Sequence, residues 1–431
     1  MRTDSGIRTR VPRAALAAAT AASLVAGGVL VATIGSGSAQ AATTALGSNW
    51  YASAPYDMPL DNTPPDLTQV LAATGEKAFV LAFVLAENGS SCAPAWDGGS
   101  STVSSGDSVG TQINALRAVG GDVSVSFGGY GGTKLGQVCG SASATAAAEQ
   151  QVITAYGLHA IDLDLEEPEY ENTSAIANEL GAAQILQANN PGLYVSVTIP
   201  GTSAGTGWFG TQLLDEAKTL GFTPNSFSIM PFDGGFSGAS SQISALQAFN
   251  GILTSTFGWS SATAYTHEGV SSMNGRTDSA EYFYQTDFQS VLTWAESVGL
   301  GRYSFWSVNR DRQCNPPSNN GTHSGSCSSV TQNSWDFTKY DAEFAGATPP
   351  VTTSATASAT ATTASPSASA SATSTGTGST GGSCAAAWSS TTSYSSGAVV
   401  SYNGHNWTAN QWNYNEVPGG ASGAWNDNGA C

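Results

Sequence analysis

Three acidic side chains alternate with apolar ones in the stretch Ala160-Ile161-Asp162-Leu163-Asp164-Leu165-Glu166. Successive side chains of a β-strand point to opposite faces, so Asp162, Asp164 and Glu166 would share one face. Neighbouring carboxyl groups there lie about 6.7 Å apart. At an effective dielectric constant of about 20, each pair repels by about 2.5 kcal/mol, or about two pKa units. At least one carboxyl group should therefore keep its proton near neutral pH, as a general acid must.

Two other interpretations of these acids are weaker. A solvated acidic edge would continue into Glu167, Glu169 and Glu171, but the intervening Ile and Leu residues need a buried face of their own. A calcium-binding EF-hand loop needs Gly at its sixth position, where counting from Asp162 gives Glu167. The pattern therefore favours acid catalysis at the end of a buried strand.

Residues 44–346 alternate strand and helix patterns and are long enough for one large domain. The predicted strands are 50–53, 78–85, 123–127, 161–165, 194–199, 226–231, 270–273 and 303–308, and helical patterns fall at 112–119, 146–156, 174–187, 212–220, 242–257 and 286–298. This order predicts an α/β fold, a (β/α)8 TIM barrel, whose active site lies at the carboxyl ends of the strands. Glu166 lies at such an end.

The acidic stretch resembles the Asp-x-x-Asp-x-Asp-x-Glu signature of glycoside hydrolase family 18, the retaining chitinases. Asp162, Asp164 and Glu166 match its last three acids, whereas His159 and Ala160 stand where the family has Asp and Gly. If the strand entry carries a bulge or turn, His159 faces the same side as Asp162 and influences its charge. Otherwise it faces the helical layer and is a structural residue.

Further motifs in the family's order extend the resemblance over the whole domain. Ser126-Phe127-Gly128-Gly129 matches Ser-x-Gly-Gly on the third strand, and Met230-Pro231-Phe232-Asp233 resembles Met-x-Tyr-Asp on the sixth. The run from Phe305 to Asp311 is similar to the last strand of a bacterial subgroup. In that subgroup the Trp at the position of Trp306 forms the base of the −1 sugar site. The segment from Gly269 to Asp278 is similar to that subgroup's seventh strand.

Each motif also has a physical interpretation that does not depend on the family. Gly128-Gly129 would let loop backbone pass close to the acids, and it fits neither nucleotide-binding glycine spacing. Trp306 would offer a flat face to a pyranose ring, or it would simply fill the barrel. Asp233 would position the substrate's acetamido group, or it would be the N-cap of the following helix.

Residues 1–41 resemble an export signal, with Arg2, Arg8 and further arginines before an apolar run and a small-x-small site at Ala39-Gln40-Ala41. We expect cleavage there and secretion. The formal net charge of −18 at pH 7 would fall to about −21 on loss of four arginines and Asp4. So acidic a chain disfavours nucleic acid and anionic membranes as partners and suits a neutral polymer.

The six cysteines should form three disulfides in an exported protein. Fifteen connectivities are possible, and we favour Cys92–Cys139, Cys314–Cys327 and Cys384–Cys431 because each bridge is then local. The four scattered histidines show no zinc spacing, so we expect no metal and no cofactor.

A linker rich in Ala, Ser and Thr spans 347–382 and separates the barrel from a module at 383–431. A unit this small needs a staple, which Cys384–Cys431 can supply, so we expect a disulfide-stapled all-β module. It is similar to the small chitin-binding modules of bacterial chitinases, of carbohydrate-binding family 5/12 type. Not every aromatic side chain there can be core; we place the binding face on Trp407, Trp412, Tyr414 and Trp425.

The resemblance implies a secreted, monomeric endo-chitinase that acts on chitin and chito-oligosaccharides. Glu166 would be the general acid, Asp164 would stabilise an oxazolinium ion formed by the substrate's own acetamido group, and Asp162 would share its proton. Two alternatives stay open. An endo-β-N-acetylglucosaminidase would use a similar acid pair, although the module argues against it, and a non-catalytic chitin lectin usually lacks the terminal acid.

Overall fold

The computed structural model describes residues 44–347 and, towards the C-terminus, 384–389, 393–394, 398–409, 413–414, 417–419 and 425–431. The predicted export segment and nearly all of the predicted linker lie outside these ranges. Contacts divide the chain into two compact units, Met1–Thr353 and Ser354–Cys431. None of the helices in the described ranges combines the length and the apolar character that a membrane crossing requires.

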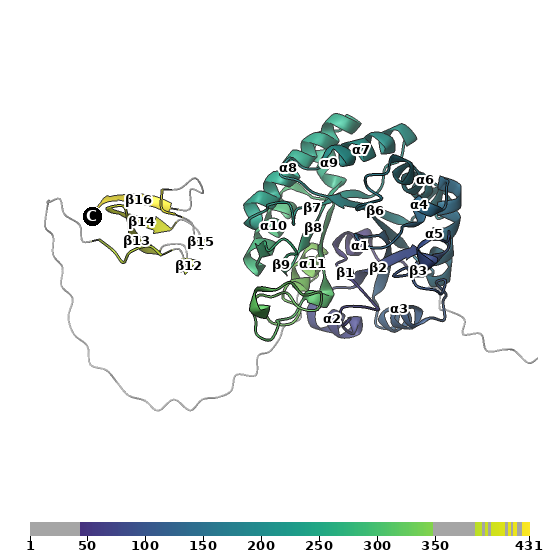
Figure 1. Cartoon of the computed structure of the whole chain (residues 1–431), viewed down its shortest axis with the longest axis horizontal. Helices are drawn as coiled ribbons and strands as arrows, with labels where there is room; N and C mark the ends of the chain where they lie inside the picture. Colours follow the sequence, from purple (N-terminus) through teal and green to yellow (C-terminus); the bar gives the residue numbers. More distant parts are fainter. Residues whose placement is uncertain are drawn as a thin grey trace, which may run out of the picture. The chain divides into compact units, whose positions relative to one another are not determined.

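The first unit is a closed barrel of parallel strands surrounded by helices (Figure 1). In barrel order the strands are β1 (Tyr56–Asp57), β2 (Ala78–Ala86), β4 (Asp122–Gly128), β5 (Ala160–Asp164), β6 (Tyr194–Pro200), β7 (Ser226–Met230), β8 (Glu268–Met273) and β11 (Arg302–Trp306). Pairing of β1 with both β2 and β11 closes the ring. Beside it, β3 (Pro94–Trp96) lies antiparallel to β2, and β9 (Gly275–Arg276) pairs with β10 (Tyr282–Phe283). The predicted TIM barrel is confirmed.

Helices follow the strands around the outside of the barrel. They are α2 (Leu67–Thr74), α3 (Ser108–Ala118), α4 (Leu135–Val138), α5 (Ala142–Tyr156), α6 (Thr173–Asn189), α7 (Trp208–Leu220), α8 (Gly238–Phe257), α9 (Ser261–Thr266), α10 (Gln285–Val298) and α11 (Thr338–Phe344). Each predicted helix overlaps one of these, and every predicted strand except the first overlaps a barrel strand.

The predicted first strand, 50–53, is wrong: it belongs to helix α1 (Ser48–Ser53). Its Trp-Tyr pair has a high β-propensity, but propensity yields to packing. Tyr51 is buried, and its hydroxyl donates to the Asp122 carboxylate over 2.6 Å at the start of β4. The barrel strand begins only at Tyr56 and is two residues long.

The two faces of the strands differ in polarity. On β6, Val195 and Val197 belong to the large apolar core, which contains buried residues of the surrounding helices. Between them, Ser196 turns inward and donates to Asp162 over 2.6 Å. Asp162 and Asp164 are only 0% and 3% exposed. The acids therefore line the inside of the barrel, and the solvated-edge interpretation is excluded.

His159 lies at the opposite end of the barrel from Glu166, just before β5. Its Nδ1 is 3.0 Å from an Asp122 oxygen, and the Arg117 Nε lies 2.7 Å from the other. These contacts tie the starts of β4 and β5 to α3. Of the two alternatives for His159, the structure supports the structural one.

The C-terminal unit contains an antiparallel sheet of β13 (Val399–Tyr402), β14 (His405–Ala409) and β16 (Trp425–Ala430), and a pair of β12 (Ser393–Tyr394) with β15 (Asn413–Tyr414). Cys384–Cys431 joins the ends of this unit. Cys92–Cys139 and Cys314–Cys327 clasp loops of the barrel. All three predicted disulfide pairings are confirmed.

A first prediction concerns Gly128, which ends β4 with a φ of 120°. A Cβ atom there would overlap the carbonyl oxygen of Asp164, the same oxygen that accepts from the Gly129 N–H over 2.7 Å. Gly128→Ala should therefore lower the free energy of unfolding by about 2 kcal/mol or more. The matched control is Gly131→Ala, since nothing lies within 4 Å of a Cβ at that position. Equal melting temperatures for the two variants would contradict the close approach.

A second prediction concerns pH and stability. Burial raises the pKa of Glu268, at the start of β8, to about 9, whereas an unfolded glutamate titrates near ~4.3. Its contribution to stability is therefore complete below the unfolded value and is lost as pH rises towards 9. Glu268→Gln should reduce the fall in melting temperature between pH 5 and pH 9 by at least about 2 °C. An unchanged pH dependence would contradict the buried, protonated state.

Candidate active site

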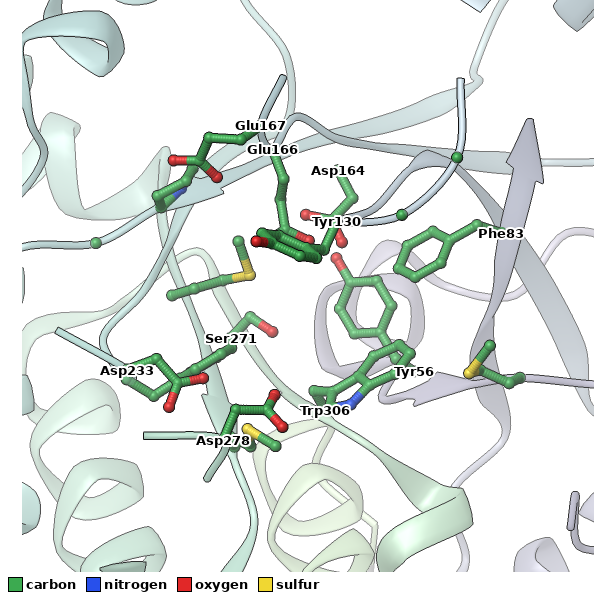
Figure 2. A pocket seen from close by; sticks show the side chains of 18 of the residues that line it. Tyr56, Phe83, Tyr130, Asp164, Glu166, Glu167, Asp233, Ser271, Asp278 and Trp306 are labelled. Carbon is green, nitrogen blue, oxygen red and sulfur yellow. The ribbon is translucent and has the colours of Figure 1, made fainter. Parts of the chain in front are cut away.

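A cleft of about 930 Å³ opens at the carboxyl ends of the barrel strands. Asp164 and Glu166 line it after β5, Asp233 after β7, and Trp306 at the end of β11 (Figure 2). Met230 lines it at the end of β7. Parallel strands bring these residues together because their carboxyl ends meet at one end of the barrel.

Asp162 lies below the cleft at the centre of a hydrogen-bond cluster. Its Oδ2 accepts from the hydroxyls of Tyr56 over 2.8 Å and Ser126 over 2.7 Å. Its Oδ1 accepts from Ser196 over 2.6 Å, and the Arg302 Nη2 lies 3.8 Å from that oxygen. Hydroxyl donors thus contact both carboxyl oxygens of Asp162, and a guanidinium group lies near one of them. Ser126, which the sequence suggested as a substrate-binding residue, is fully buried and contacts the innermost acid instead of lining the cleft.

Asp164 lies between Asp162 and Glu166 on the inner face of β5. Burial, followed by the negative charges of Glu166 and Asp162, raises its pKa well above the usual range. Its Oδ1 is buried and has no hydrogen-bond partner among the described residues. Burial thus favours the protonated form of Asp164, and its Oδ1 can engage a group that enters from the cleft.

Glu166 lies two residues beyond the end of β5, on the wall of the cleft. Burial, followed by the negative charge of Glu167, raises its pKa to about 7, against the opposing charge of Lys134. A carboxyl group with this pKa can both give and take a proton near neutral pH. Figure 2 shows its side chain extending toward the same space as Asp164.

Aromatic rings form a flat side of the cleft next to the acids (Figure 2). Trp306 stacks on Phe83 with ring centroids 5.6 Å apart and planes inclined by 10°, and Tyr56 packs against Trp306 at 6.0 Å. Trp306 is only partly buried and lines the cleft. The structure therefore favours a ring that faces a ligand over one that merely fills the barrel.

Asp233 is not a helix N-cap, because α8 begins five residues later with Ser237 at that position. Its Oδ1 accepts from the Ser279 N–H over 2.6 Å, and its own N–H donates to Glu281 over 2.7 Å. Asp233 thus joins the loops after β7 and β8 while lining the cleft. The cleft also contains Asp278.

Several residues of the cleft were not predicted from the sequence. Tyr130 follows the Gly128-Gly129 pair and is 74% exposed, a position that its adjacency to the glycines could have suggested. Tyr56 and Phe83 carried no signal: one lies in a two-residue strand and the other in a continuous apolar run. No group of His, Cys, Asp or Glu within the described ranges could hold a metal ion.

One of the predicted binding residues of the C-terminal module is wrong. Trp425 is 6% exposed and packs edge-on against Tyr394 in the module's core, so its ring offers no binding face. Trp407 is half-buried, and its Nε1 donates to the Tyr402 carbonyl. Trp412 and the side chain of Tyr414 lie outside the described residues, so their binding role stays a prediction.

Comparisons with solved structures place the barrel among chitinases. Active domain 2 of the chitinase from Pyrococcus furiosus superposes with a TM-score of 0.59 and 25% identity, over 68% of this chain and 93% of that one. The same archaeal domain is also known in complex with chito-oligosaccharides.

Two curated relatives of the chain are also named as chitinases. A "Probable bifunctional chitinase/lysozyme" of Escherichia coli (strain K12) is 26% identical over 282 residues, or 60% of this chain and 30% of that protein. "Endochitinase 11" of Metarhizium anisopliae is 25% identical over 283 residues, or 60% of this chain and 52% of that protein. The chain thus spans about a third to a half of the length of these relatives.

At the other end of the chain, the model of carbohydrate-binding module family 5/12 matches residues 387–426. Together these likenesses agree with the resemblance seen in the sequence: the barrel is similar to the catalytic domains of chitinases, and residues 387–426 match the model of carbohydrate-binding module family 5/12.

Proposed function

We propose that the protein hydrolyses the β-1,4 links between N-acetylglucosamine units of chitin. One observation carries the proposal: Glu166, with a pKa of about 7, shares a cleft with Asp164, whose pKa is raised by burial, and with the ring of Trp306, which stacks on Phe83. A proton donor beside a flat apolar ring fits a glycosidic oxygen and the pyranose that bears it. The chitinase relatives and the family 5/12 module support chitin as the substrate.

The reaction would begin with proton transfer from Glu166 to the leaving glycosidic oxygen. The carbonyl oxygen of the substrate's acetamido group would attack the anomeric carbon as that bond breaks, giving a cyclic oxazolinium ion. Glu166, now a carboxylate, would take a proton from water as the water opens the ring. Because the anomeric carbon is attacked twice, from opposite faces, the product keeps the β-configuration. The scheme departs from the usual two-carboxylate one in that the first nucleophile is the substrate's acetamido group and not a second enzyme carboxylate.

Asp164 would orient the acetamido group and offset the positive charge of the oxazolinium ion. Its position supports this role, since it lies on the same inner face as Glu166 and its Oδ1 is unpaired in the described part of the chain. Asp162, held by hydroxyl donors and Arg302, would receive part of the Asp164 proton as charge develops.

We further propose that the protein is secreted and that the module holds it on insoluble chitin. The basic and apolar start of the chain and three disulfides support export, because such bonds persist in oxidising compartments. The terminal acid argues against a non-catalytic lectin, and the module argues against an enzyme dedicated to soluble glycans.

Glu166→Gln tests the assignment of the general acid. Glutamine fills the same volume but cannot supply the proton, so kcat on chitotetraose should fall by at least about 100-fold. The dissociation constant of the oligosaccharide, measured by calorimetry, should change little. Glu296→Gln, an exposed change on α10, is the matched control. A well-folded Glu166→Gln protein with near-parental turnover would overturn the assignment.

Truncation after Ala347 tests the role of the module. This boundary keeps α11 and its last contacts, including the Asn49 side-chain bond to the Ala345 carbonyl. Tethering raises the local concentration of enzyme without altering the chemistry. Release of reducing ends from insoluble chitin should therefore fall, whereas turnover of chitotetraose should stay within about twofold. Equal loss on both substrates would mean that the removed part belongs to the active site or to the barrel's stability.

A further inference from the structure

Lys134 places a buried positive charge behind the cleft. The residue follows the loop after β4, caps the start of α4 and is only 1% exposed. Its ammonium group donates to the backbone carbonyls of Tyr130 and Glu167, each over 3.1 Å. Among the described residues, none of the ion pairs within 4.0 Å includes Lys134. Burying an ammonium group without a contacting carboxylate costs several kcal/mol unless other interactions offset it.

The two carbonyls belong to the two loops that build one wall of the cleft. Tyr130 lies on the loop after β4, and Glu167 directly follows Glu166. The ammonium group therefore ties the backbone beside the general acid to the neighbouring loop. An uncharged donor such as an amide could make the same two hydrogen bonds with a lower desolvation cost. The bonds alone thus give no reason for a charge at this position.

The surrounding acids supply that reason. The carboxyl groups that act on Lys134 are those of Glu169, Glu166, Asp164 and Glu167, in decreasing order of effect. Glu169 leads into a buried cluster with Glu149 and Glu179, where burial raises the pKa of each carboxyl group. The ammonium group of Lys134 thus lies among the carboxyl groups of the cleft and of this buried cluster.

Glu166 faces charges of both signs from several elements. Glu167, Asp233 and Asp278 raise its pKa, as burial does, whereas Lys134 lowers it. Lys134 thus opposes burial and the three neighbouring carboxyl groups in their effect on the pKa of Glu166. A general acid that must also act as a base in the second step needs this balance, because too high a proton affinity would impair the deprotonated role.

We propose that Lys134 is a positioning residue of the active site: its buried ammonium group holds the Glu166 loop in place and sets, through its charge, the pH range in which Glu166 exchanges its proton. The inference rests on the proposed function of Glu166. It assigns to Lys134 no contact with substrate.

Three substitutions separate the charge of Lys134 from its hydrogen bonds. Lys134→Arg keeps both, Lys134→Gln keeps donors without charge, and Lys134→Met keeps neither. Lys218→Met, an exposed change on α7, is the matched control. The measurement is the pH dependence of kcat on chitotetraose in the full-length protein, with melting temperatures taken alongside.

Loss of the charge should raise the proton affinity of Glu166, so the protonated acid persists to higher pH. The alkaline limb of the profile should move upward by at least about 0.5 pH unit in Lys134→Gln and Lys134→Met. Lys134→Arg and Lys218→Met should keep the parental limb. If Lys134→Met fails to fold, the comparison of Gln with Arg still decides the result.

Superimposable alkaline limbs for Lys134→Gln and the parent would overturn the inference, and so would an equal shift in Lys134→Arg. A ¹³C NMR titration of the Glu166 carboxyl group provides the same test without turnover. A higher midpoint in Lys134→Gln supports the role of the charge even if chitotetraose is not hydrolysed. In that case the proposed function fails, while the electrostatic role of Lys134 stands on its own result.

Discussion

The structure depends on keeping three acidic side chains inside the barrel, two on strand β5 and one just beyond its end. Such burial opposes folding, since carboxylates lose hydration and repel one another. The barrel offsets this unfavourable free energy in a different way for each of the three acids. Asp162 is surrounded by hydroxyl donors and Arg302, burial favours the protonated form of Asp164, and Glu166 reaches the cleft. Strand β5 and the two residues after it thus hold three carboxyl groups in three different environments.

This requirement explains the polarity of the whole barrel. The inner face carries serines on neighbouring strands, such as Ser126 on β4 and Ser196 on β6, where a typical barrel would pack branched apolar residues. The outer faces of the same strands supply the apolar core under the helices. Stability therefore comes from the outer layer, which leaves the interior free to hold charges for chemistry.

Much of this was predictable because the signals were local. Alternation around Asp162 predicted the strand and the inner face, and the Gly128-Gly129 pair predicted the close backbone approach that Gly128 makes. The failures arose where tertiary packing decides. The Trp-Tyr pair of α1 is helical because Tyr51 packs across the barrel's end. Trp425 is core rather than binding face, since an aromatic-rich segment does not reveal which rings face inward.

Other site residues could not be found from local patterns at all. Phe83 reaches the cleft from an apolar strand, and Lys134 acts through a buried ammonium group that meets the carbonyl of Glu167, 33 residues away in the chain. Their roles depend on which loops the fold brings together, and single-sequence spacing carries no such information.

The central claim is that Glu166 and the substrate's own acetamido group together cleave the glycosidic bond. The most direct test is ¹H NMR of the products during the first moments of chitotetraose hydrolysis, before mutarotation. Substrate-assisted cleavage predicts that the newly formed reducing ends appear as the β-anomer and convert only later to the equilibrium mixture. Initial appearance of the α-anomer would mean direct attack by water, and it would contradict the account.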